Sequence, residues 1–422
     1  MPIPLPRHAK ILIVGAGPAG LATGLSLIKH GVNPQDIVVV NRVAQAENTS
    51  RAIVIHSATL EALDSLGCAE DLVSRAVKGT RFQMQSRSGT PLFGLRFSSL
   101  DSYTKFPFFL IIPQNITEQV LEKHAKALGI KIHSPYTVVG MKTSESGEGL
   151  DVSFESGDVV SANFVVGADG ARSVIRQLAG IDFMGSDGAP LHDDSPTESL
   201  QSVIADVSLS SPPPSNNTLY ATLSDGALCI LAPFEDSHGL YKTDQPIHRL
   251  VFLSNVAPPS QPPLEVLQKY VDDWAPFMPS SDQSYRISEV YWSSRFRHRS
   301  AAAATFYKKL STNGRIFLVG DAAHIHSPAG GQGMNLGLRD AVGLGAIIGG
   351  HFGADDFDEA LEKHAVERRG RAVKTIGLTN TLLAGARNIM SNSFVYWALK
   401  TLLAIPFVQG AVVWRLSGLG NR

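Results

Sequence analysis

KILIVGAGPAGLATGLSLIKHG, residues 10–31, is the stretch of this sequence that decides the fold. Its first five residues are a short apolar run rich in β-branched side chains, which predicts a buried strand of a parallel sheet. Residues 21–30 show helical spacing of apolar side chains and end at Gly31, a residue type that commonly ends helices. Residues 37–40, IVVV, predict a second strand. The stretch therefore opens a strand–helix–strand unit of about 30 residues.

The glycines between the first strand and the helix fit a site for the phosphates of a dinucleotide. In the pattern Gly15-x-Gly17-x-x-Gly20, the first glycine allows the tight turn and the second lets backbone approach a pyrophosphate. The third lets the helix pack on the strand. The free N–H groups and the positive dipole of the helix N-terminus then face the phosphates. We predict that Gly15, Gly17, Ala19 and Gly20 bind a cofactor.

The end of the second strand departs from the usual dinucleotide pattern. An Asp or Glu is expected there to accept a hydrogen bond from a ribose hydroxyl, and this chain has Asn41 followed by Arg42. An amide oxygen still accepts such a bond, without the added strength of a charge. We predict that both residues bind the cofactor. The alternative is an NADP site with Arg42 on a 2′-phosphate.

Composition excludes several classes of function. The 422 residues carry 37 Lys+Arg and 38 Asp+Glu, and a formal charge of −1 offers no long-range attraction for nucleic acid. The two cysteines, Cys68 and Cys229, cannot form a disulfide framework, and no metal-ligand cluster is visible. No apolar stretch precedes the first strand, so we expect no signal peptide and a cytoplasmic protein. The sequence gives no indication of an oligomeric state.

The apolar segment 394–414 is about long enough to cross a bilayer. It contains Lys400, Pro406 and Gln409, which disfavour a span. We expect two short amphipathic helices, broken at Pro406 and packed on the core. Association with a membrane surface through this segment is the alternative.

The middle of the chain has a different character. Residues 186–263 contain proline-rich and polar loops between alternating runs at 219–223 and 227–232, which predicts an inserted, antiparallel domain. Residues 80–97 alternate in the manner of a hairpin that turns at Ser88-Gly89. A further buried strand is expected at 315–319, followed by a helix over 334–348.

Three later motifs resemble those of one flavoprotein family. GADGARS at 167–173 follows a predicted buried strand, and GDAAH at 320–324 is followed by PAGGQGMN at 328–335. They are similar to the DG and GD motifs of class A FAD-dependent monooxygenases, the p-hydroxybenzoate hydroxylase-like enzymes. Two further parts of the sequence are similar to segments that line the flavin in that family: Ser50-Arg51-Ala52 with Thr59-Leu60-Glu61, and Pro113-Gln114 with Thr117-Glu118. The resemblance runs from residue 10 to about 345 and is weak across 186–290.

The resemblance implies an α/β fold. It has a Rossmann-like FAD-binding domain (a parallel sheet in a three-layer ββα arrangement), an inserted, mostly antiparallel β-sheet substrate domain and a helical C-terminus. The expected FAD-binding domain comprises residues 8–77, 108–185 and 312–385. The substrate domain then comprises 78–107 and 186–311, and the C-terminal helices lie in 386–422.

Residues for FAD follow from the matched motifs and from their chemistry. Asp321, after a predicted strand, can hydrogen-bond a polyol such as the ribityl chain, and the helix opened by GGQGMN presents N–H groups to the pyrimidine edge of the flavin. By resemblance, Arg51 and Gln114 touch FAD, while Asp169 and Arg172 hold it and the approaching nicotinamide. The predicted cofactor-binding residues in these motifs are Arg51, Gln114, Asp169, Asp321, Pro328, Gly331, Gly333, Met334 and Asn335.

The resemblance also implies an activity. The enzyme would use NAD(P)H and O2 to hydroxylate a small aromatic or polyketide-like molecule through a flavin C4a-hydroperoxide, in specialised metabolism. The catalytic candidates are Arg51, Tyr220 and Tyr241, because a tyrosine in the substrate domain can relay a phenolic proton. His56, His324 and His326 are expected to pack or to orient loops rather than to take part in chemistry.

Missing motifs separate this chain from other flavoproteins. The two cysteines lie too far apart for a disulfide reductase, no second GxGxxG occurs, and the tryptophans form no WxWxIP signature. An NADP site at Asn41-Arg42 would leave Asp321 and GGQGMN unexplained. The alternatives that stay open are an oxidase, dehydrogenase or epoxidase on the same scaffold, and an escort protein that binds FAD without catalysis.

Overall fold

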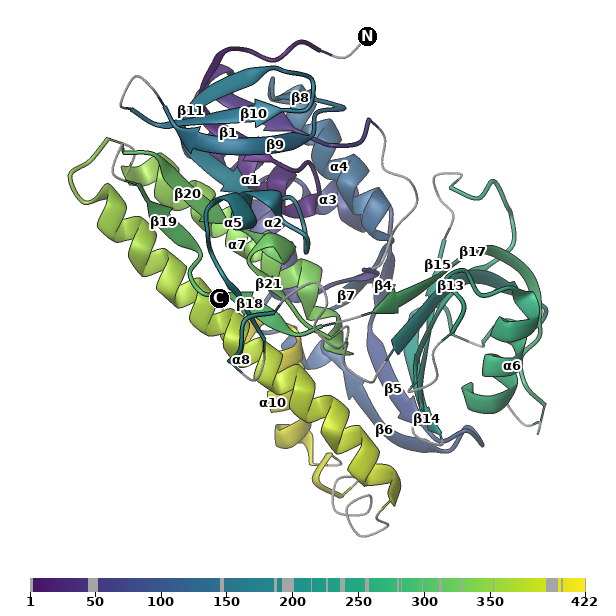
Figure 1. Cartoon of the computed structure of the whole chain (residues 1–422). Coiled ribbons are helices and arrows are strands. Elements are labelled where there is room, and N and C mark those ends of the chain that lie inside the picture. Colours follow the sequence, from purple (N-terminus) through teal and green to yellow (C-terminus); the bar gives the residue numbers. More distant parts are fainter. Residues whose placement is uncertain are drawn as a thin grey trace.

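The elements of the computed structural model gather around two large sheets, one of eight strands and one of seven (Figure 1). Small three-stranded sheets lie between them, and a long helix runs along one side. The structure describes residues 3–44, 52–144, 148–185, 188–191, 201–213, 215–224, 227–235, 240–254, 258–278, 281, 283–297, 299–310, 313–327, 329–351, 353–391, 401–403 and 405–421.

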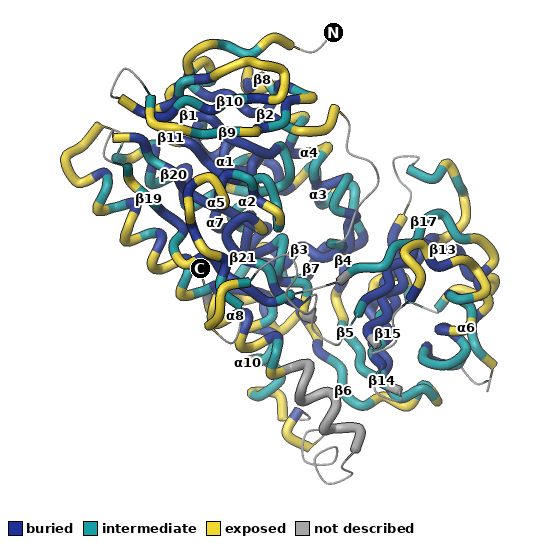
Figure 2. The backbone as a smooth tube through the Cα atoms, in the orientation of Figure 1, coloured by how far each residue is buried: buried dark blue, intermediate teal, exposed yellow. Residues whose placement is uncertain are grey.

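The first strand, β1 (His8–Val14), lies inside the eight-stranded sheet, parallel to β2 (Ile37–Val40) and β11 (Val159–Gly167). Residues 11–14 are at most 6% exposed, so the strand is covered on both faces, as its apolar run predicts (Figure 2). The sheet continues through β8 (Lys131–His133), β9 (Val138–Thr143), β10 (Leu150–Phe154), β19 (Tyr307–Lys309) and β20 (Arg315–Leu318). Strands β8 and β20 extend the parallel part, while β9, β10 and β19 pair antiparallel.

Small residues let two of the helices around this sheet approach each other closely. Helix α1 (Pro18–Lys29) packs against α7 (Gln332–His351), where a Cβ on Gly345 would lie 2.4 Å from the Ser26 Cβ. The Ser26 hydroxyl also donates to the Val342 carbonyl (2.7 Å). The other helices around the sheet are α2 (Ser57–Ser65), α3 (Ala69–Val73), α4 (Gln114–Ala127), α5 (Val174–Leu178) and α8 (Phe357–Ser391).

The seven-stranded sheet has the order β17-β13-β16-β15-β14-β5-β6 and is antiparallel except where β14 pairs with β5. Its strands are β5 (Arg81–Gln85), β6 (Pro91–Arg96), β13 (Gln201–Leu209), β14 (Thr218–Ser224), β15 (Ala227–Phe234), β16 (Ile247–Ser254) and β17 (Ile287–Arg297). Helix α6 (Leu264–Trp274) covers its outer face (Figure 1). The predicted 80–97 hairpin is confirmed, with Gly89 at φ 76° in its turn.

Two predicted domain boundaries cut through elements that the structure keeps together. β19 falls inside the range predicted for the substrate domain, yet it pairs with β20 of the eight-stranded sheet. Helix α8 continues past residue 385. The two small sheets also join distant segments: β3 (Val54–Ile55), β4 (Val77–Gly79) and β7 (Phe109–Ile111) form one, and β12 (Phe183–Gly185), β18 (Ala301–Ala303) and β21 (His324–Ile325) form the other. A strand of three residues has too little pattern to be predicted from sequence.

A buried ionic network joins α7 to α8. Asp340 accepts hydrogen bonds from Arg368 Nε (2.5 Å) and pairs with His324 Nε2 (2.6 Å). Burial opposes its negative charge, but the Arg368 guanidinium and His324 hold the pKa of Asp340 well below its usual range. His324 therefore orients the segment after β20, as we predicted from sequence.

The C-terminal segment contributes a short helix, α10 (Pro406–Leu416), that begins at the predicted break, Pro406. Val413 is buried in the core that also contains Leu95 and Phe97, whereas Phe407 is 85% exposed. Residues 392–400 and 404 lie outside the described part of the chain. Among the residues that are described, no helix combines the length and the apolar character needed to cross a membrane.

The α/β class that the sequence predicts, with a parallel sheet, antiparallel sheets and C-terminal helices, is confirmed.

Candidate functional site

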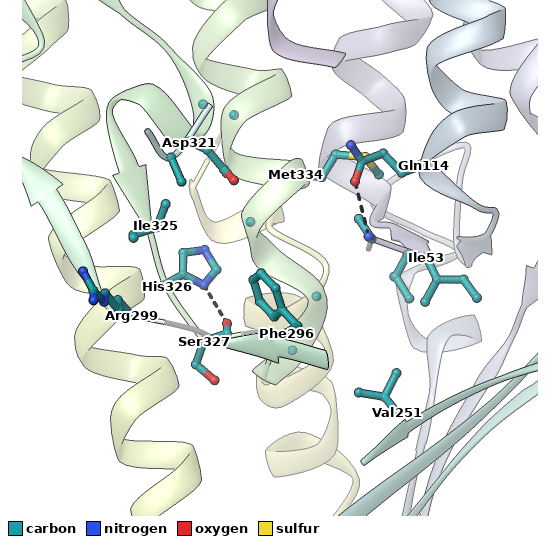
Figure 3. A pocket seen from close by; sticks show the side chains of 18 of the residues that line it. Ile53, Gln114, Val251, Phe296, Arg299, Asp321, Ile325, His326, Ser327 and Met334 are labelled. Carbon is teal, nitrogen blue, oxygen red and sulfur yellow. Dashed lines mark hydrogen bonds between the residues drawn. The ribbon is translucent and has the colours of Figure 1, made fainter. Parts of the chain in front are cut away.

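A cavity of about 1970 Å³ lies between the two large sheets. One part of its lining comes from the glycine loop, the segment after β20 and the start of α7, and another from the seven-stranded sheet. In Figure 3, Asp321, Met334 and Gln114 lie along one end of the cavity, Val251 lies toward the other end, and Phe296 lies between them. Residues separated by some 300 positions in sequence therefore share one site.

The glycine loop is pressed against neighbouring backbone. Gly15 has φ +109°, its N–H donates to the Val40 carbonyl (2.8 Å), and a Cβ on it would lie 2.2 Å from the Ala168 carbonyl oxygen. A Cβ on Gly20 would lie 1.9 Å from the Gly15 carbonyl oxygen. Gly17, which caps α1, has no atom within 4 Å of a built Cβ and lines the cavity. Two glycines thus permit packing, and the middle one leaves room for a ligand at the helix N-terminus.

Asn41 and Arg42, predicted to bind the cofactor, have different surroundings. The Asn41 side chain accepts from the Ala16 N–H (3.4 Å) and donates to the Val43 carbonyl (3.0 Å), so it ties β2 to the glycine loop. Arg42 is among the residues that line the cavity, together with Pro18 and Ala19.

The turn after β20 carries Asp321 into the cavity beside the glycine loop. Gly320 has φ +60°, and a Cβ there would lie 2.9 Å from the Ala19 Cβ. This close approach places Asp321, which lines the cavity, next to the start of α1. Figure 3 shows the Asp321 side chain in the cavity.

The short turn before α7 supplies Gly331 to the cavity lining, and the first turn of α7 supplies Gly333 and Met334. Asn335, predicted to bind the cofactor, is instead fully buried. Its amide nitrogen donates to the carbonyls of Val54 (2.8 Å) and Gly331 (2.6 Å), and its oxygen accepts from the His56 N–H (2.8 Å). Asn335 therefore holds α7 against residues 52–56, which we call the wall segment.

The wall segment is held at its other end by Gln114. The Gln114 N–H donates to the Ala52 carbonyl (3.1 Å), and the Ala52 N–H donates to Gln114 Oε1 (3.4 Å). Gln114 Nε2 in turn donates to Glu118 (2.9 Å), and both of these side chains line the cavity. The predicted residues Arg51 and Pro328 lie outside the described residues.

Asp169 lines the cavity and also caps a short helix. Its carboxylate accepts hydrogen bonds from the Ser173 hydroxyl (2.5 Å) and from the N–H groups of Val174 (2.7 Å) and Ile175 (3.1 Å). Arg172, one residue before this cap, is exposed at the cavity. The DG motif is therefore held rigid by its own aspartate.

Arg176 is a site residue that the sequence reasoning missed. Its guanidinium donates to the carbonyls of Ala322 (2.9 Å) and Ala171 (3.0 Å) and lies over the Phe183 ring (3.9 Å). It is 5% exposed and joins the DG motif to the GD motif. An arginine among the apolar residues Val174, Ile175 and Leu178, directly after the DG motif, was the available signal.

Two histidines line the cavity in neutral form. The His56 Nε2 hydrogen bonds to the Gly330 carbonyl (2.9 Å), and the His326 Nδ1 hydrogen bonds to the Ser327 carbonyl (2.8 Å; Figure 3). A carbonyl only accepts, so these nitrogens carry the proton. Burial lowers the pKa of both His56 and His326 to about 4. Neutral rings at these positions add no positive charge to the cavity wall.

Burial of histidines predicts a pH dependence of stability. Burial also lowers the pKa of His248 and His364 to about 4, which makes four such groups with His56 and His326. Between pH 6.5 and about 4 the unfolded chain binds protons that the folded chain does not, so unfolding becomes easier as pH falls. Each of these histidines lowers the free energy of unfolding by up to about 1.4 kcal/mol for each pH unit in this range.

Urea unfolding of the apoprotein between pH 7.5 and 5 measures this slope. In the variant His248→Leu, the free energy of unfolding should change less steeply with pH, because one of the four histidine contributions is missing. A free energy of unfolding that stays level from pH 6.5 to 5 would contradict the burial of neutral histidines.

The tyrosines predicted as catalytic do not line the cavity. Tyr220 faces the opposite side of the seven-stranded sheet, where it packs with the residues around α6, while its neighbours Leu219 and Ala221 line the cavity. The Tyr241 hydroxyl donates to Asp206 (2.6 Å), and its ring stacks on Tyr291. Strand alternation turns Tyr220 to the other face of the sheet, and the hydroxyl of Tyr241 is engaged by Asp206, so a catalytic role for either residue stays a prediction.

The lining from the seven-stranded sheet is mainly apolar. Its apolar members are Phe82, Met84, Leu92, Phe93, Leu95, Ile204, Leu219, Ala221, Leu223, Leu228, Ile230, Val251 and Phe296. The C-terminal segment closes this part with Leu403, Val412 and Leu416. Polar groups come from Ser294, Arg295 and Arg299. Among the described residues, no three His, Cys, Asp or Glu side chains are grouped as a metal site.

Comparisons with known proteins agree with this geometry. The chain is 29% identical over 419 residues to YhjG of Bacillus subtilis, named an uncharacterized aromatic compound monooxygenase, covering 97% of this chain and 75% of that protein. It is 29% identical over 367 residues to the 12-dehydrotetracycline 5-monooxygenase/anhydrotetracycline 6-monooxygenase of Streptomyces rimosus, covering 85% of this chain and 66% of that protein. The chain thus spans two thirds to three quarters of these relatives' lengths.

Solved structures show the same fold. The anhydrotetracycline hydroxylase OxyS of Streptomyces rimosus superposes with a TM-score of 0.73 at 28% identity, covering 98% of this chain and 77% of that one. The p-nitrophenol 4-monooxygenase PnpA of Pseudomonas putida gives 0.77 at 23% identity, covering 99% and 100%. The model of a family described as the FAD binding domain matches residues 8–378. The resemblance stated from sequence is confirmed: the chain belongs to the FAD-binding-domain family of the class A flavin-dependent monooxygenases.

Proposed function

We propose that this protein is an FAD-dependent monooxygenase that uses NAD(P)H and O2 to hydroxylate an aromatic or polyketide-like small molecule in specialised metabolism. The observation that carries the proposal is that one cavity is lined both by the glycine loop and Asp321 and by the apolar face of the seven-stranded sheet. A hydrophobic ring bound on that face lies in the same enclosed space as the cofactor.

The residues present fit FAD. Gly17 leaves open space at the N-terminus of α1 for the pyrophosphate, and Asp321 offers a carboxylate for the ribityl hydroxyls. Gly331 and Gly333 place the N-terminus of α7 at the cavity, where its dipole favours negative charge. FAD, when bound, supplies the redox chemistry that the side chains lack, by taking a hydride from NAD(P)H and reducing O2.

The protein's own task is to position the substrate and exclude water. Side chains such as Val251, Ile230 and Phe296 desolvate the ring and hold it toward the cofactor side of the cavity. Ser294, Arg295 and Arg299 provide donors for phenol, enol or carbonyl oxygens at its polar edge. This division between apolar walls and a few donors suits a substrate with fused rings and several oxygen atoms.

We also propose that Arg172, exposed beside the DG motif, contacts NAD(P)H during its visit. Its charge matches the pyrophosphate of that cofactor. A cytoplasmic location is proposed as well, because Cys68 and Cys229 are both free thiols.

NAD(P)H oxidation tests the function. The FAD-loaded protein is mixed with NADPH or NADH and a panel of phenols, naphthols, anthraquinones and tetracyclic polyketides. We expect oxidation to accelerate with at least one fused-ring phenol and 18O from 18O2 to enter the product. No acceleration by any aromatic compound would refute the hydroxylase, whereas acceleration that yields only peroxide would indicate an oxidase.

Asp321→Ala should weaken FAD binding. Loss of hydrogen bonds from a carboxylate costs about 1.5–3 kcal/mol, or roughly 10- to 100-fold in affinity. Fluorescence titration of the apoprotein with FAD measures this change. Asp158→Ala, which removes the same charge from the exposed turn between β10 and β11, serves as the control. Equal affinities for the two variants would contradict the assignment of Asp321.

A further inference from the structure

An ion pair with no exposed surface lies on the cavity face of the seven-stranded sheet. Asp206 on β13 and Arg249 on β16 occupy directly opposed positions, and both are 0% exposed. The guanidinium binds the carboxylate with two bonds, Nε to Oδ1 (2.6 Å) and Nη2 to Oδ2 (2.7 Å). Such a fork fixes the orientation of the arginine as well as its position.

Neighbouring side chains hold this pair rigidly in the sheet. The Tyr241 hydroxyl donates to Asp206 Oδ2 (2.6 Å), and the Tyr241 ring stacks on Tyr291 with centroids 4.9 Å apart. The rings of Phe234 and Trp292 each lie 5.8 Å from the guanidinium carbon. Burial disfavours the charge of the guanidinium, but the Asp206 carboxylate raises the pKa of Arg249, so it is charged.

Arg249 also reaches out of its own sheet. Its Nη1 donates to the Ala52 carbonyl (3.3 Å), the first residue of the wall segment. The same carbonyl accepts the Gln114 N–H (3.1 Å), and Ala52 and Gln114 both line the cavity. Arg249 therefore joins the seven-stranded sheet to the wall segment on the cofactor side.

The two strands that carry this ion pair, β13 and β16, also contribute apolar side chains to the cavity lining. Ile204 and Val251 lie two positions from Asp206 and Arg249, on the same face, and both line the cavity. Buried ion pairs contribute little net stability, so stability alone does not account for this one. The pair lies where it can set the distance between the strands that carry Ile204 and Val251 and the wall segment.

We propose that Arg249, oriented by Asp206, is a positioning residue that fixes the substrate-bearing sheet to the wall segment. This inference rests on the proposed function. A ring on Ile204 and Val251 is thereby held at a set distance from the cofactor, so that oxygen activation leads to hydroxylation rather than to release of peroxide. Loss of the link leaves the substrate-bearing sheet and the wall segment each intact, but their positions relative to one another are no longer fixed.

Paired substitutions test the link without leaving a buried charge. Arg249→Met alone strands the Asp206 carboxylate and is expected to destabilise the fold. The double variant Asp206→Leu/Arg249→Met replaces the pair with apolar side chains of similar size, a change that proteins commonly tolerate. We expect it to fold and bind FAD, while product formed per NAD(P)H falls about tenfold or more. Arg249→Lys keeps the positive charge but cannot make the two parallel bonds to Asp206, so the product formed per NAD(P)H should lie between the values of the wild type and the double variant.

Ser208→Ala is the matched control. Ser208 lies on the same strand and face as Asp206, is 1% exposed, and hydrogen bonds only within its sheet region, to Tyr291 (2.9 Å) and the Pro246 carbonyl (3.1 Å). Removing the Ser208 hydroxyl changes the sheet but not the link to Ala52. The coupling, which is the amount of product formed per NAD(P)H oxidised, should therefore be unchanged. Normal coupling in the double variant, or an equal loss in Ser208→Ala, would overturn the proposal.

A second readout does not depend on turnover. If the link is lost, the bound flavin should be quenched more strongly by iodide and FAD should dissociate faster in the double variant than in the wild type or Ser208→Ala. If no aromatic compound stimulates the wild type, the proposed function fails, and these two measurements still decide whether Arg249 holds the wall segment. Unchanged quenching and dissociation would then refute the link itself.

Discussion

Gly15→Ala is expected to prevent formation of a stable FAD-binding core. The new Cβ would lie 2.2 Å from the Ala168 carbonyl oxygen and 3.0 Å from the Asp169 Cα, and the backbone there has φ +109°. Both obstacles are backbone atoms of the neighbouring β-strand connection, so no rotamer relieves them. Backbone strain of about 1–3 kcal/mol and overpacking of about 1–3 kcal/mol together approach the total stability of many domains. Circular dichroism melting and FAD titration measure the outcome.

Gly17→Ala is the control, because it changes the same loop without a clash. Gly17 has no atom within 4 Å of a built Cβ and caps α1 with φ −75°. The apoprotein should lose no more than about 1 kcal/mol, the usual difference between cap residues. Its FAD affinity should nevertheless fall, because the methyl group enters the space for the pyrophosphate. Unaltered FAD binding in Gly17→Ala would mean that the phosphates lie elsewhere.

Asn335→Ala should separate the start of α7 from the wall segment. The substitution leaves the carbonyls of Val54 and Gly331 and the N–H of His56 without their partner in a buried site. At about 1–3 kcal/mol for each buried unsatisfied group, the free energy of unfolding should fall by roughly 3 kcal/mol or more. Denaturant titrations of the apoprotein and of the FAD complex give this value, and FAD affinity should fall in parallel.

Asn335→Asp separates hydrogen bonding from packing. It has nearly the same volume and keeps an acceptor for the His56 N–H, but it faces two carbonyls with a carboxylate instead of a donor. We expect it to be at least as damaging as alanine. A variant Asn335→Asp with wild-type stability would show that the two donated bonds are unimportant.

Much of the fold was predictable because local rules and tertiary context agree. The strand at β1, the loop Gly15-x-Gly17-x-x-Gly20 and the helix α1 each carry a pattern that only one conformation satisfies. The same holds for the turn at Gly89 and the break at Pro406. Small edge strands such as β19 have no such pattern, and this is why the predicted domain boundary near residue 311 separated it from β20.

The site was predicted less completely, for a physical reason. Both faces of the seven-stranded sheet are covered, one by α6 and one by the cavity, so apolar residues occur on both and the sequence does not reveal which face Tyr220 occupies. Asp206 and Arg249 had a signal: each is a charged residue inside an otherwise apolar strand, in VIADV and HRLVF. Pairing two such residues across 43 positions requires the strand register, which only the structure supplies.

The strand order also determines how long β11 waits for one of its neighbouring strands while the chain is being synthesised. β11 pairs with β1 early, but its other parallel neighbour, β20, begins about 150 residues later in the chain. At about 5–20 residues per second on the ribosome, that neighbour arrives roughly 8–30 s later. During this interval the nascent chain exposes the edge of a strand whose last four residues are all buried in the finished protein. Nascent chains that end before residue 315 should therefore depend on chaperones, and expression hosts rich in them should give the higher yield of intact protein.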